Sequence, residues 1–232
     1  NITKNTSALT ISGNCTVGDS VQLYVDSVAT GTLMNCTTTT WTQDIALATG
    51  ATYAVTASGS DVAGNTMTTA ALSITIDSGI PTVVSAETMY SNGNGYIDHY
   101  KVTFNKNIVD FTFPGYLVNN IGNNQTVWKL ANYANPRLAH GTSAPEIDNI
   151  DDNIIYLKIT EGPIPDTGDK PDISTTTAIP IMDLAGNFPS QIFSITVTES
   201  DRAKPILVSA VSLGEISLKA AFSEVVTATS AE

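Results

Sequence analysis

The chain has 232 residues and a formal net charge of −12, from ten basic and 22 acidic side chains. Nucleic-acid binding needs clustered Lys and Arg, and Lys4 is the one basic residue among residues 1–100, which excludes a nucleic-acid partner. No apolar run approaches the ~18 residues of a membrane-spanning helix, so this segment is not expected to insert into a membrane.

The composition favours β-structure. Hydrophobic residues make up 42% of the chain, which is enough for a packed core, whereas charged residues make up only 14%. The surface must therefore be built largely from the 33 Thr, 20 Ser and 18 Asn residues. Because Thr is β-branched and fits a pleated sheet, whereas solvated helices use Lys, Glu and Arg, the predicted fold class is all-β.

The two cysteines, Cys15 and Cys36, are 21 positions apart, and no CxxC motif or pair of histidines lies near them. Their spacing therefore matches no zinc site, and two alternatives remain, a disulfide or two buried thiols. The disulfide is favoured because both residues stand beside turn-forming Asn, Gly and Thr. A disulfide would indicate an oxidising, extracytoplasmic environment.

An internal repeat divides the chain into modules. Residues 61–65 (Asp-Val-Ala-Gly-Asn) return at 183–187, and residues 81–86 (Pro-Thr-Val-Val-Ser-Ala) return as Pro-Ile-Leu-Val-Ser-Ala at 205–210. A third similarity joins 102–105 with 220–223. We therefore predict one β-sandwich at 1–78, a second, larger one at 79–199, and the opening strands of a third, incomplete module at 200–232.

Alternating apolar residues predict the strands of each module. The first module has such positions at 21–25, 53–57 and 72–76, and the second at 100–104, 155–159 and 193–197. The tail has apolar runs at 205–210 and 216–222, and two strands alone cannot bury a sandwich core. Alternation with one buried face is what a two-sheet sandwich requires.

The repeated Asp-x-Ala-Gly-Asn string is interpreted as a hairpin turn. The Asp side chain would cap the turn and the Gly would supply a backbone with positive φ. A ligand-binding turn is the alternative. The residues concerned are Asp61, Gly64, Asn65, Asp183, Gly186 and Asn187.

The order of these motifs resembles a known family. Residues 12–15 (Ser-Gly-Asn-Cys), Trp41-Thr42, the run from Leu47 to Ala57 and the 61–65 turn are similar to tandem bacterial immunoglobulin-like domains of large surface proteins. The second module is similar to related repeats that begin Pro-x-x-Val-Ser-Ala and continue with an Asn-Gly turn and a Val-Thr-Phe strand. The resemblance implies that Cys15 and Cys36 pair across the first sandwich and that Tyr53 forms a tyrosine corner.

Residues 92–98 (Asn-Gly-Asn-Gly-Tyr-Ile-Asp) are similar to the start of a calcium-binding loop. Asn92, Asn94 and Asp98 would supply side-chain oxygens and Tyr96 a backbone carbonyl. A single carboxylate is weak, so a second would have to come from another loop, such as Asp148–Asp152. The favoured alternative is a tight turn without an ion, because each Asn-Gly step forms a turn by itself.

The sequence offers little for catalysis, so the chain is not expected to be an enzyme. The two histidines, His99 and His140, are far apart, and the nucleophile-elbow, zinc-protease and phosphate-loop motifs are absent. The acidic residues at 146–152 and 161–172 are interpreted as solvated loops, although a glycosidase-like carboxylate pair is an alternative.

These observations lead to one functional hypothesis with an alternative. The chain is expected to be an extracellular, structural or adhesive segment of a bacterial cell-surface protein: a stalk, an adhesin, or a surface-layer or filament subunit. Its partners would be neighbouring modules of the same chain and a surface protein or glycan. The alternative is a set of accessory modules of an extracellular hydrolase or a carbohydrate-binding protein. Carbohydrate binding would need a row of exposed aromatic residues, whereas Trp41 and Trp128 are expected in the core.

Overall fold

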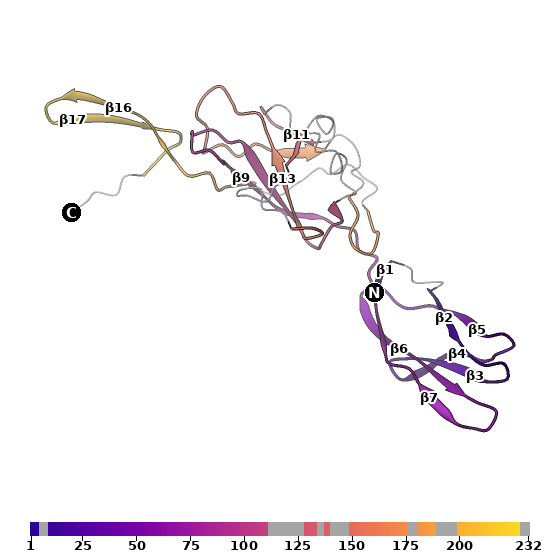
Figure 1. Ribbon diagram of the computed structural model, residues 1–232. Coiled ribbons are helices and arrows are strands. Elements are labelled where there is room, and N and C mark those ends of the chain that lie inside the picture. Colours follow the sequence, from indigo (N-terminus) through magenta and orange to yellow (C-terminus); the bar gives the residue numbers. More distant parts are fainter. Residues whose placement is uncertain are drawn as a thin grey trace. The chain divides into compact units, whose positions relative to one another are not determined.

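The computed structural model describes residues 1–4, 9–110, 128–133, 137–139, 149–175, 181–188 and 199–227. Its described residues form two compact units, Asn1–Gly79 with Leu184–Asn187, and Ile80–Asp183 with Phe188–Glu232. The regular secondary structure of these residues is made of strands, which confirms the all-β fold class (Figure 1). The strand predicted at 193–197 lies outside the described residues.

The first unit is a β-sandwich. Its larger sheet has the strand order β1-β8-β6-β3-β4, with β7 paired to β6, and its smaller sheet pairs β2 with β5. The strands are β1 (Ile2–Thr3), β2 (Leu9–Asn14), β3 (Ser20–Val25), β4 (Val28–Asn35), β5 (Thr40–Ile45), β6 (Ala51–Ser60), β7 (Thr66–Thr68) and β8 (Leu72–Ile76).

The core of the first unit lies between these two sheets. Leu23, Val55 and Ile76 come from the larger sheet and Ile45 from the smaller one, and all four are buried. Buried residues alternate with less buried ones along β3 (Val21 and Leu23) and β8 (Ile74 and Ile76), as the sequence pattern predicted. Each of the two sheets therefore has one apolar face, which lies against the core, and one face rich in Thr and Ser.

A disulfide and a side-chain hydrogen bond link separate segments of this sandwich. Cys15 and Cys36 form a disulfide with their Cα atoms 6.3 Å apart. The hydroxyl of Tyr53 donates a 3.1 Å hydrogen bond to the carbonyl of Ala48, five residues upstream, which is the geometry of a tyrosine corner.

The second unit has a five-stranded sheet in the order β12-β13-β10-β9-β15, a two-stranded sheet of β11 and β14, and a hairpin of β16 and β17. The strands are β9 (Val83–Met89), β10 (His99–Phe104), β11 (Trp128–Leu130), β12 (Arg137–Ala139), β13 (Ile154–Lys158), β14 (Ile173–Thr175), β15 (Glu199–Asp201), β16 (Leu207–Gly214) and β17 (Ser217–Phe222).

One face of β10 anchors the core of the second unit. Tyr100, Val102 and Phe104 are at most 1% exposed and pack with Leu157 of β13 and Ile173 of β14. The hydroxyl of Tyr100 is also satisfied, since it donates a 2.7 Å hydrogen bond to the carbonyl of Pro171. β13 departs from the predicted alternation, because the side chains on both of its faces are buried at residues 155–157.

The larger sheets of the two units share one topological feature: in each sheet, the first and last of its described strands along the chain are parallel neighbours. In the first unit β1 pairs in parallel with β8, and in the second unit β9 pairs in parallel with β15. The amides of Thr75 and Asp77 donate to the carbonyls of Asn1 and Thr3, at 2.8 and 2.9 Å.

Candidate functional site

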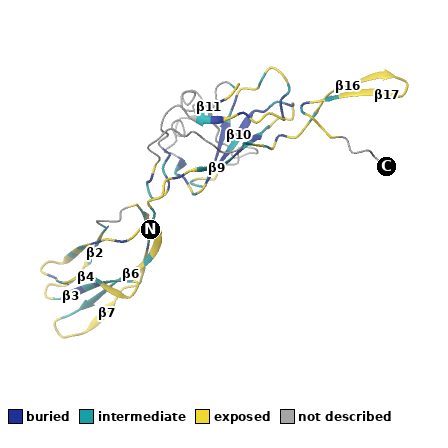
Figure 2. Cartoon of the chain, turned by 180° about the vertical axis from the view of Figure 1, so that it is seen from behind, coloured by how far each residue is buried: buried dark blue, intermediate teal, exposed yellow. Residues whose placement is uncertain are grey.

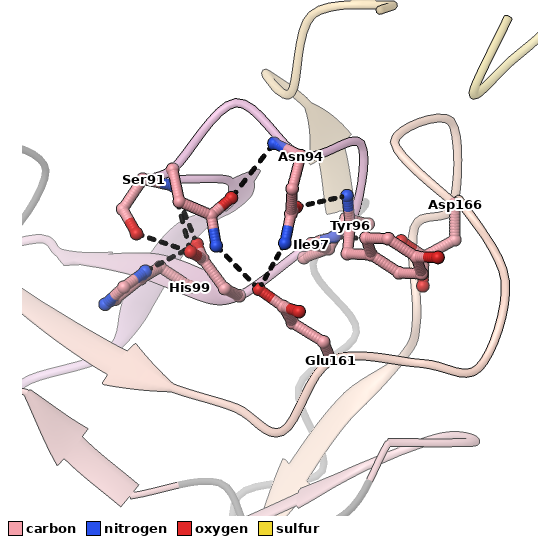
Figure 3. A network of polar contacts seen from close by, with 9 residues as sticks. Ser91, Asn94, Tyr96, Ile97, His99, Glu161 and Asp166 are labelled. Atoms are coloured by element: carbon pink, nitrogen blue, oxygen red, sulfur yellow. Dashed lines mark hydrogen bonds and ion pairs between the residues drawn. The ribbon is translucent and has the colours of Figure 1, made fainter. Parts of the chain in front are cut away.

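A network of polar side chains joins two loops at one end of the second unit (Figure 3). The first loop, residues 91–98, connects β9 with β10, and the second, residues 165–169, lies between β13 and β14. The amide of Asp166 donates to the carbonyl of Gly95 at 2.9 Å, and the amide of Ile97 donates to the carboxylate of Asp166 at 2.8 Å. These reciprocal bonds fix the two loops to each other.

Two asparagines shape the 91–98 loop. The side-chain oxygen of Asn92 accepts from the amide of Asn94, and that of Asn94 accepts from the amide of Tyr96, both at 3.0 Å. Each side chain thus closes a local turn, as Asn commonly does. Their amide groups both donate to one oxygen of Glu161, at 2.8 and 2.9 Å.

The carboxylate of Asp98 closes the base of this loop. It accepts hydrogen bonds from the backbone and hydroxyl of Ser91 and lies 2.6 Å from Nδ1 of His99, which is fully buried. Burial raises the pKa of Asp98, but the hydrogen bonds from His99 and Ser91 outweigh it and hold the pKa below its ordinary value. These bonds therefore stabilise the fold above about pH 4 and lose that effect as the pH falls through the folded-state pKa.

Asp166 is buried, whereas Glu161, Asp169 and Asp172 are exposed, so the expectation of solvated acidic residues at 161–172 is wrong at Asp166 alone. It is 9% exposed, and its second carboxylate oxygen accepts a hydrogen bond from the hydroxyl of Tyr133. Burial and the charge of Asp166 raise the pKa of Tyr133, so this hydroxyl remains a donor. The expectation failed at Asp166 because the amide of Ile97 and the hydroxyl of Tyr133 satisfy its carboxylate inside the fold.

The calcium hypothesis can be compared with this geometry. The oxygens of Asn92 and Asn94 already accept backbone amides, and the carboxylate of Asp98 is occupied by Ser91 and His99. Within the described ranges no three acidic, His or Cys side chains converge on one point. Of the Asp148–Asp152 group suggested for a second carboxylate, Asp148 lies outside these ranges, and Asp151 and Asp152 accept the amides of Asp110 and Ile154. The donor set fits a closed turn better than an ion, and calcium binding at Asn92, Asn94, Tyr96 and Asp98 stays a prediction.

We expect the thermal midpoint of the chain to be the same in millimolar calcium and in excess chelator. A resident ion would raise it by mass action, because it would bind only the folded state. Calorimetric melts at equal ionic strength decide the matter. A calcium-dependent rise that disappears in the Asp98→Asn variant would establish the site instead.

The two loops also form a seat for the base of the β16–β17 hairpin. A Cβ atom on Gly95 would lie 2.8 Å from the side chain of Ile206, and one on Gly168 would lie 2.9 Å from Cβ of Glu224. Gly95 has a φ of +92°, so it needs glycine for its backbone as well as for this close approach. The hydroxyl of Thr167 hydrogen-bonds the buried hydroxyl of Ser223. We call Gly95, Thr167, Gly168, Ile206 and Ser223 the junction seat.

The Asp-x-Ala-Gly-Asn strings are placed at two turns. The carboxylate of Asp61 accepts from the amides of Ala63 and Asn65 and from the side chain of Asn65, at 2.8–2.9 Å, and Gly64 has a φ of +89°. Asp183 is buried and lies 3.3 Å from the ammonium group of Lys106. Gly186 has a φ of +83°, and the side chain of Asn187 donates to the carbonyl of Asp77 at 2.7 Å.

A cleft of about 380 Å³ opens between the two sheets of the first unit. Trp41, which was expected in the core, is only partly buried and lines this cleft with the apolar residues Ile11 and Leu72. The polar residues Ser12, Asn14, Thr56 and Thr69 share the lining. The cleft therefore presents one aromatic ring in a mainly apolar lining, because the side chains of Ser12 and Asn14 alternate with Gly13, which contacts the Trp41 ring. The side chain of Trp128 lies outside the described part of the chain.

Sequence reasoning missed two residues that hold the network. Glu161 and Asp166 were noted only as members of an acidic stretch, whereas they brace the 91–98 loop from 63 or more positions away in the chain. The Asp-Thr-Gly string at 166–168 was the one available signal, because Asp before a Gly turn commonly bonds backbone amides.

No protein-family model matches the sequence, and no curated protein matches it. Solved structures that are similar include a Bacteroides ovatus protein described as mixed-linkage glucan utilization locus SGBP-B in complex with a mixed-linkage heptasaccharide. It shares 14% identity, 86% of this chain and 42% of that chain are covered, and the TM-score is 0.25. Within the described residues no helix is long and apolar enough to cross a membrane.

Proposed function

We propose that this chain is a load-bearing structural segment of an extracellular bacterial surface protein, such as a stalk, an adhesin or a filament. The observation that carries the proposal is the parallel pairing of the first and last described strands of the larger sheet in each unit, β1 with β8 and β9 with β15. A pull on the two ends of such a unit loads the hydrogen bonds between these strands in shear. They must then break together rather than one after another.

Two further features support a mechanical role. The disulfide between Cys15 and Cys36 removes the intervening loop from the length that can be extended, and it suits an oxidising, extracellular environment. The junction seat joins the base of the C-terminal hairpin to the second unit through apolar contact and a buried hydrogen bond. A flexible linker, by contrast, would be rich in exposed Gly and Ser.

The experiment that tests the proposal is force extension of the whole chain, held at its two ends. We expect two separate unfolding events, one for each unit, because each has its own core. Reduction of the disulfide should lengthen the extension released by the first unit by about 7 nm, since roughly 20 residues at ~3.4 Å each are freed. Smooth extension without unfolding events would overturn the proposal.

Glycan binding is a second candidate function, favoured by the cleft in the first unit. A partly buried Trp41 in an open, mainly apolar cleft offers a ring on which a sugar could stack. Titration of the chain with soluble polysaccharides, alongside the Trp41→Ala variant, tests it. The absence of heat or of any fluorescence change with a broad panel would remove this candidate.

A further inference from the structure

One turn motif occurs twice in this chain, and the structure shows it in two different environments. Residues 61–65 and 183–187 both read Asp-x-Ala-Gly-Asn, and the second residue, Val in one and Leu in the other, is the one difference between them. Their backbones match as well, since Gly64 and Gly186 have φ of +89° and +83°. The two turns are therefore equivalent elements, and their contacts are what distinguishes them.

The second turn is held by contacts within the first unit. Its residues 184–187 belong to that unit, although they stand between β14 and β15 along the chain. The side chain of Asn187 donates to the carbonyl of Asp77 at 2.7 Å, and Asn187 is only 7% exposed. The ammonium group of Lys4 donates to the carbonyl of Gly186 at 2.8 Å. We call Lys4 and Asp77 the strand-end seat.

The strand-end seat is the end of the parallel pair of β1 and β8. The last residue pair of this ladder joins Thr3 with Ile76. Lys4 and Asp77 follow directly on the two strands. The amide of Asp77 donates to the carbonyl of Thr3 at 2.9 Å, while its carbonyl accepts the bond from the turn. The seat thus offers one acceptor and one cationic donor, and the turn offers a matching side-chain amide and carbonyl.

The first turn carries the same groups at an exposed place. It forms the tip of the β6–β7 hairpin, where residues 62–65 are exposed and Val62 reaches 86% (Figure 2). The side-chain amide of Asn65, the counterpart of Asn187, donates back to the carboxylate of Asp61 at 2.8 Å. An amide group has two N–H donors, so Asn65 can make this bond and a second one to a partner. The first turn therefore presents the groups that the second turn uses for contact.

We propose that the turn at residues 61–65 is the docking surface for another β-sandwich module of the same surface protein. This module presents the end of a parallel strand pair, with a backbone carbonyl in the place of Asp77 and a cationic side chain in the place of Lys4. Asn65 donates to that carbonyl, and the carbonyl of Gly64 accepts from that cation. The inference rests on the proposed function, because it requires the chain to be a segment of a larger modular protein.

The repeat indicates why a module of this kind fits the turn. Asp77 follows the β1–β8 pair and Asp201 ends the β9–β15 pair, and each stands four residues before a repeated proline. A strand-pair end of this design therefore recurs from unit to unit, as the turn does. Charge supports the fit as well. Hydrogen bonds from Asn65 lower the pKa of Asp61, so the turn carries a negative charge that attracts a cationic partner.

A chain lengthened by a copy of its own first unit provides such a partner. Ile2 and Ala86 hold equivalent places, since each lies opposite the residue two positions before Asp77 or Asp201. With residues 1–84 repeated ahead of the chain, Ile2 follows the copy at the native spacing of Ala86. The strand-end seat of the copy is then available to the original 61–65 turn.

Hydrogen exchange with mass spectrometry measures the docking. Met67→Leu in the copy, at an exposed position, gives the two turns peptides of different mass. We expect the amides of the original 61–65 turn to exchange at least tenfold more slowly in the lengthened chain than in the native chain, because docking opposes the local opening through which they exchange. Lys4→Ala in the copy should abolish this gain, whereas Lys4→Ala at the original position, where Lys4 contacts Gly186, should leave it unchanged.

One outcome of this experiment separates the docking from the mechanical role. The docking is overturned if the copy folds, as its own unfolding transition shows, while the original turn exchanges as fast as in the native chain. That result leaves the load-bearing role standing, since force extension tests it separately.

Leu184→Val in the native chain tests the proposal without any added module, because it makes residues 183–187 identical to residues 61–65. We expect the amides of the turn at 183–187 to keep their native exchange rates, whereas Asn187→Ala, which removes the bond to Asp77, should raise them at least tenfold. Faster exchange in Leu184→Val would show that the sequence of the first turn cannot occupy a strand-end seat, and it would overturn the proposal.

Discussion

Replacement of Phe104 by Ala is expected to lower the free energy of unfolding of the second unit by about 3–5 kcal/mol, as truncation of a buried Phe generally does. Phe104 is 1% exposed and belongs to the core that β10 and β13 share. The substitution removes most of its buried apolar surface and leaves a cavity that the surrounding strands cannot fill.

The internal repeat provides a matched control for this experiment. Phe222 stands at the equivalent position of the C-terminal hairpin but is 42% exposed, so Phe222→Ala should change the same free energy by less than about 0.5 kcal/mol. Chemical denaturation at sub-micromolar concentration, followed by tyrosine fluorescence, measures both. Equal losses in the two variants would show that the hairpin belongs to the folded core.

Removal of the disulfide is expected to cost the first unit about 3 kcal/mol, because closure of a loop of roughly 20 residues restricts the unfolded chain. The Cys15→Ser, Cys36→Ser double variant is the test, with both residues changed so that no reactive thiol remains. The unfolding midpoint of the first unit should fall while that of the second unit stays constant.

Mass spectrometry of the non-reduced chain must accompany that measurement. We expect the mass of a chain with one internal disulfide, two hydrogen masses below that of the dithiol form. If two free thiols were found, the loss of stability in the double variant would have to come from packing instead.

Much of the fold follows from local sequence patterns. Alternating apolar residues at 21–25, 53–57, 72–76 and 100–104 predicted strands that the structure contains. The prediction works because alternate residues of a strand lie on the same face of the sheet, and one face of a half-buried sheet is apolar. The 102–105 and 220–223 similarity anticipated the equivalence of β10 and β17, since strands with the same pattern and turn chemistry adopt the same register.

The candidate site could not be predicted in the same way. Its loop lies within residues 91–98, but Glu161 and Asp166, which bond to this loop, belong to the chain segment that follows β13. Which distant residues meet depends on sheet order and register, and these are set by the whole core rather than by a local motif. The burial of Tyr156 on the second face of β13 has the same origin.

The mechanical role of the parallel terminal strands is tested most directly by the Thr75→Pro variant in force extension. Thr75 donates its amide to Asn1 across the β1–β8 pair, and proline removes that donor. Ser73→Pro is the matched control, because the described bond of Ser73 to Asn1 uses its carbonyl, which proline retains. We predict that Thr75→Pro lowers the unfolding force of the first unit and that Ser73→Pro leaves it nearly unchanged. Equal forces in both variants and the native chain would contradict a load-bearing role for this strand pair.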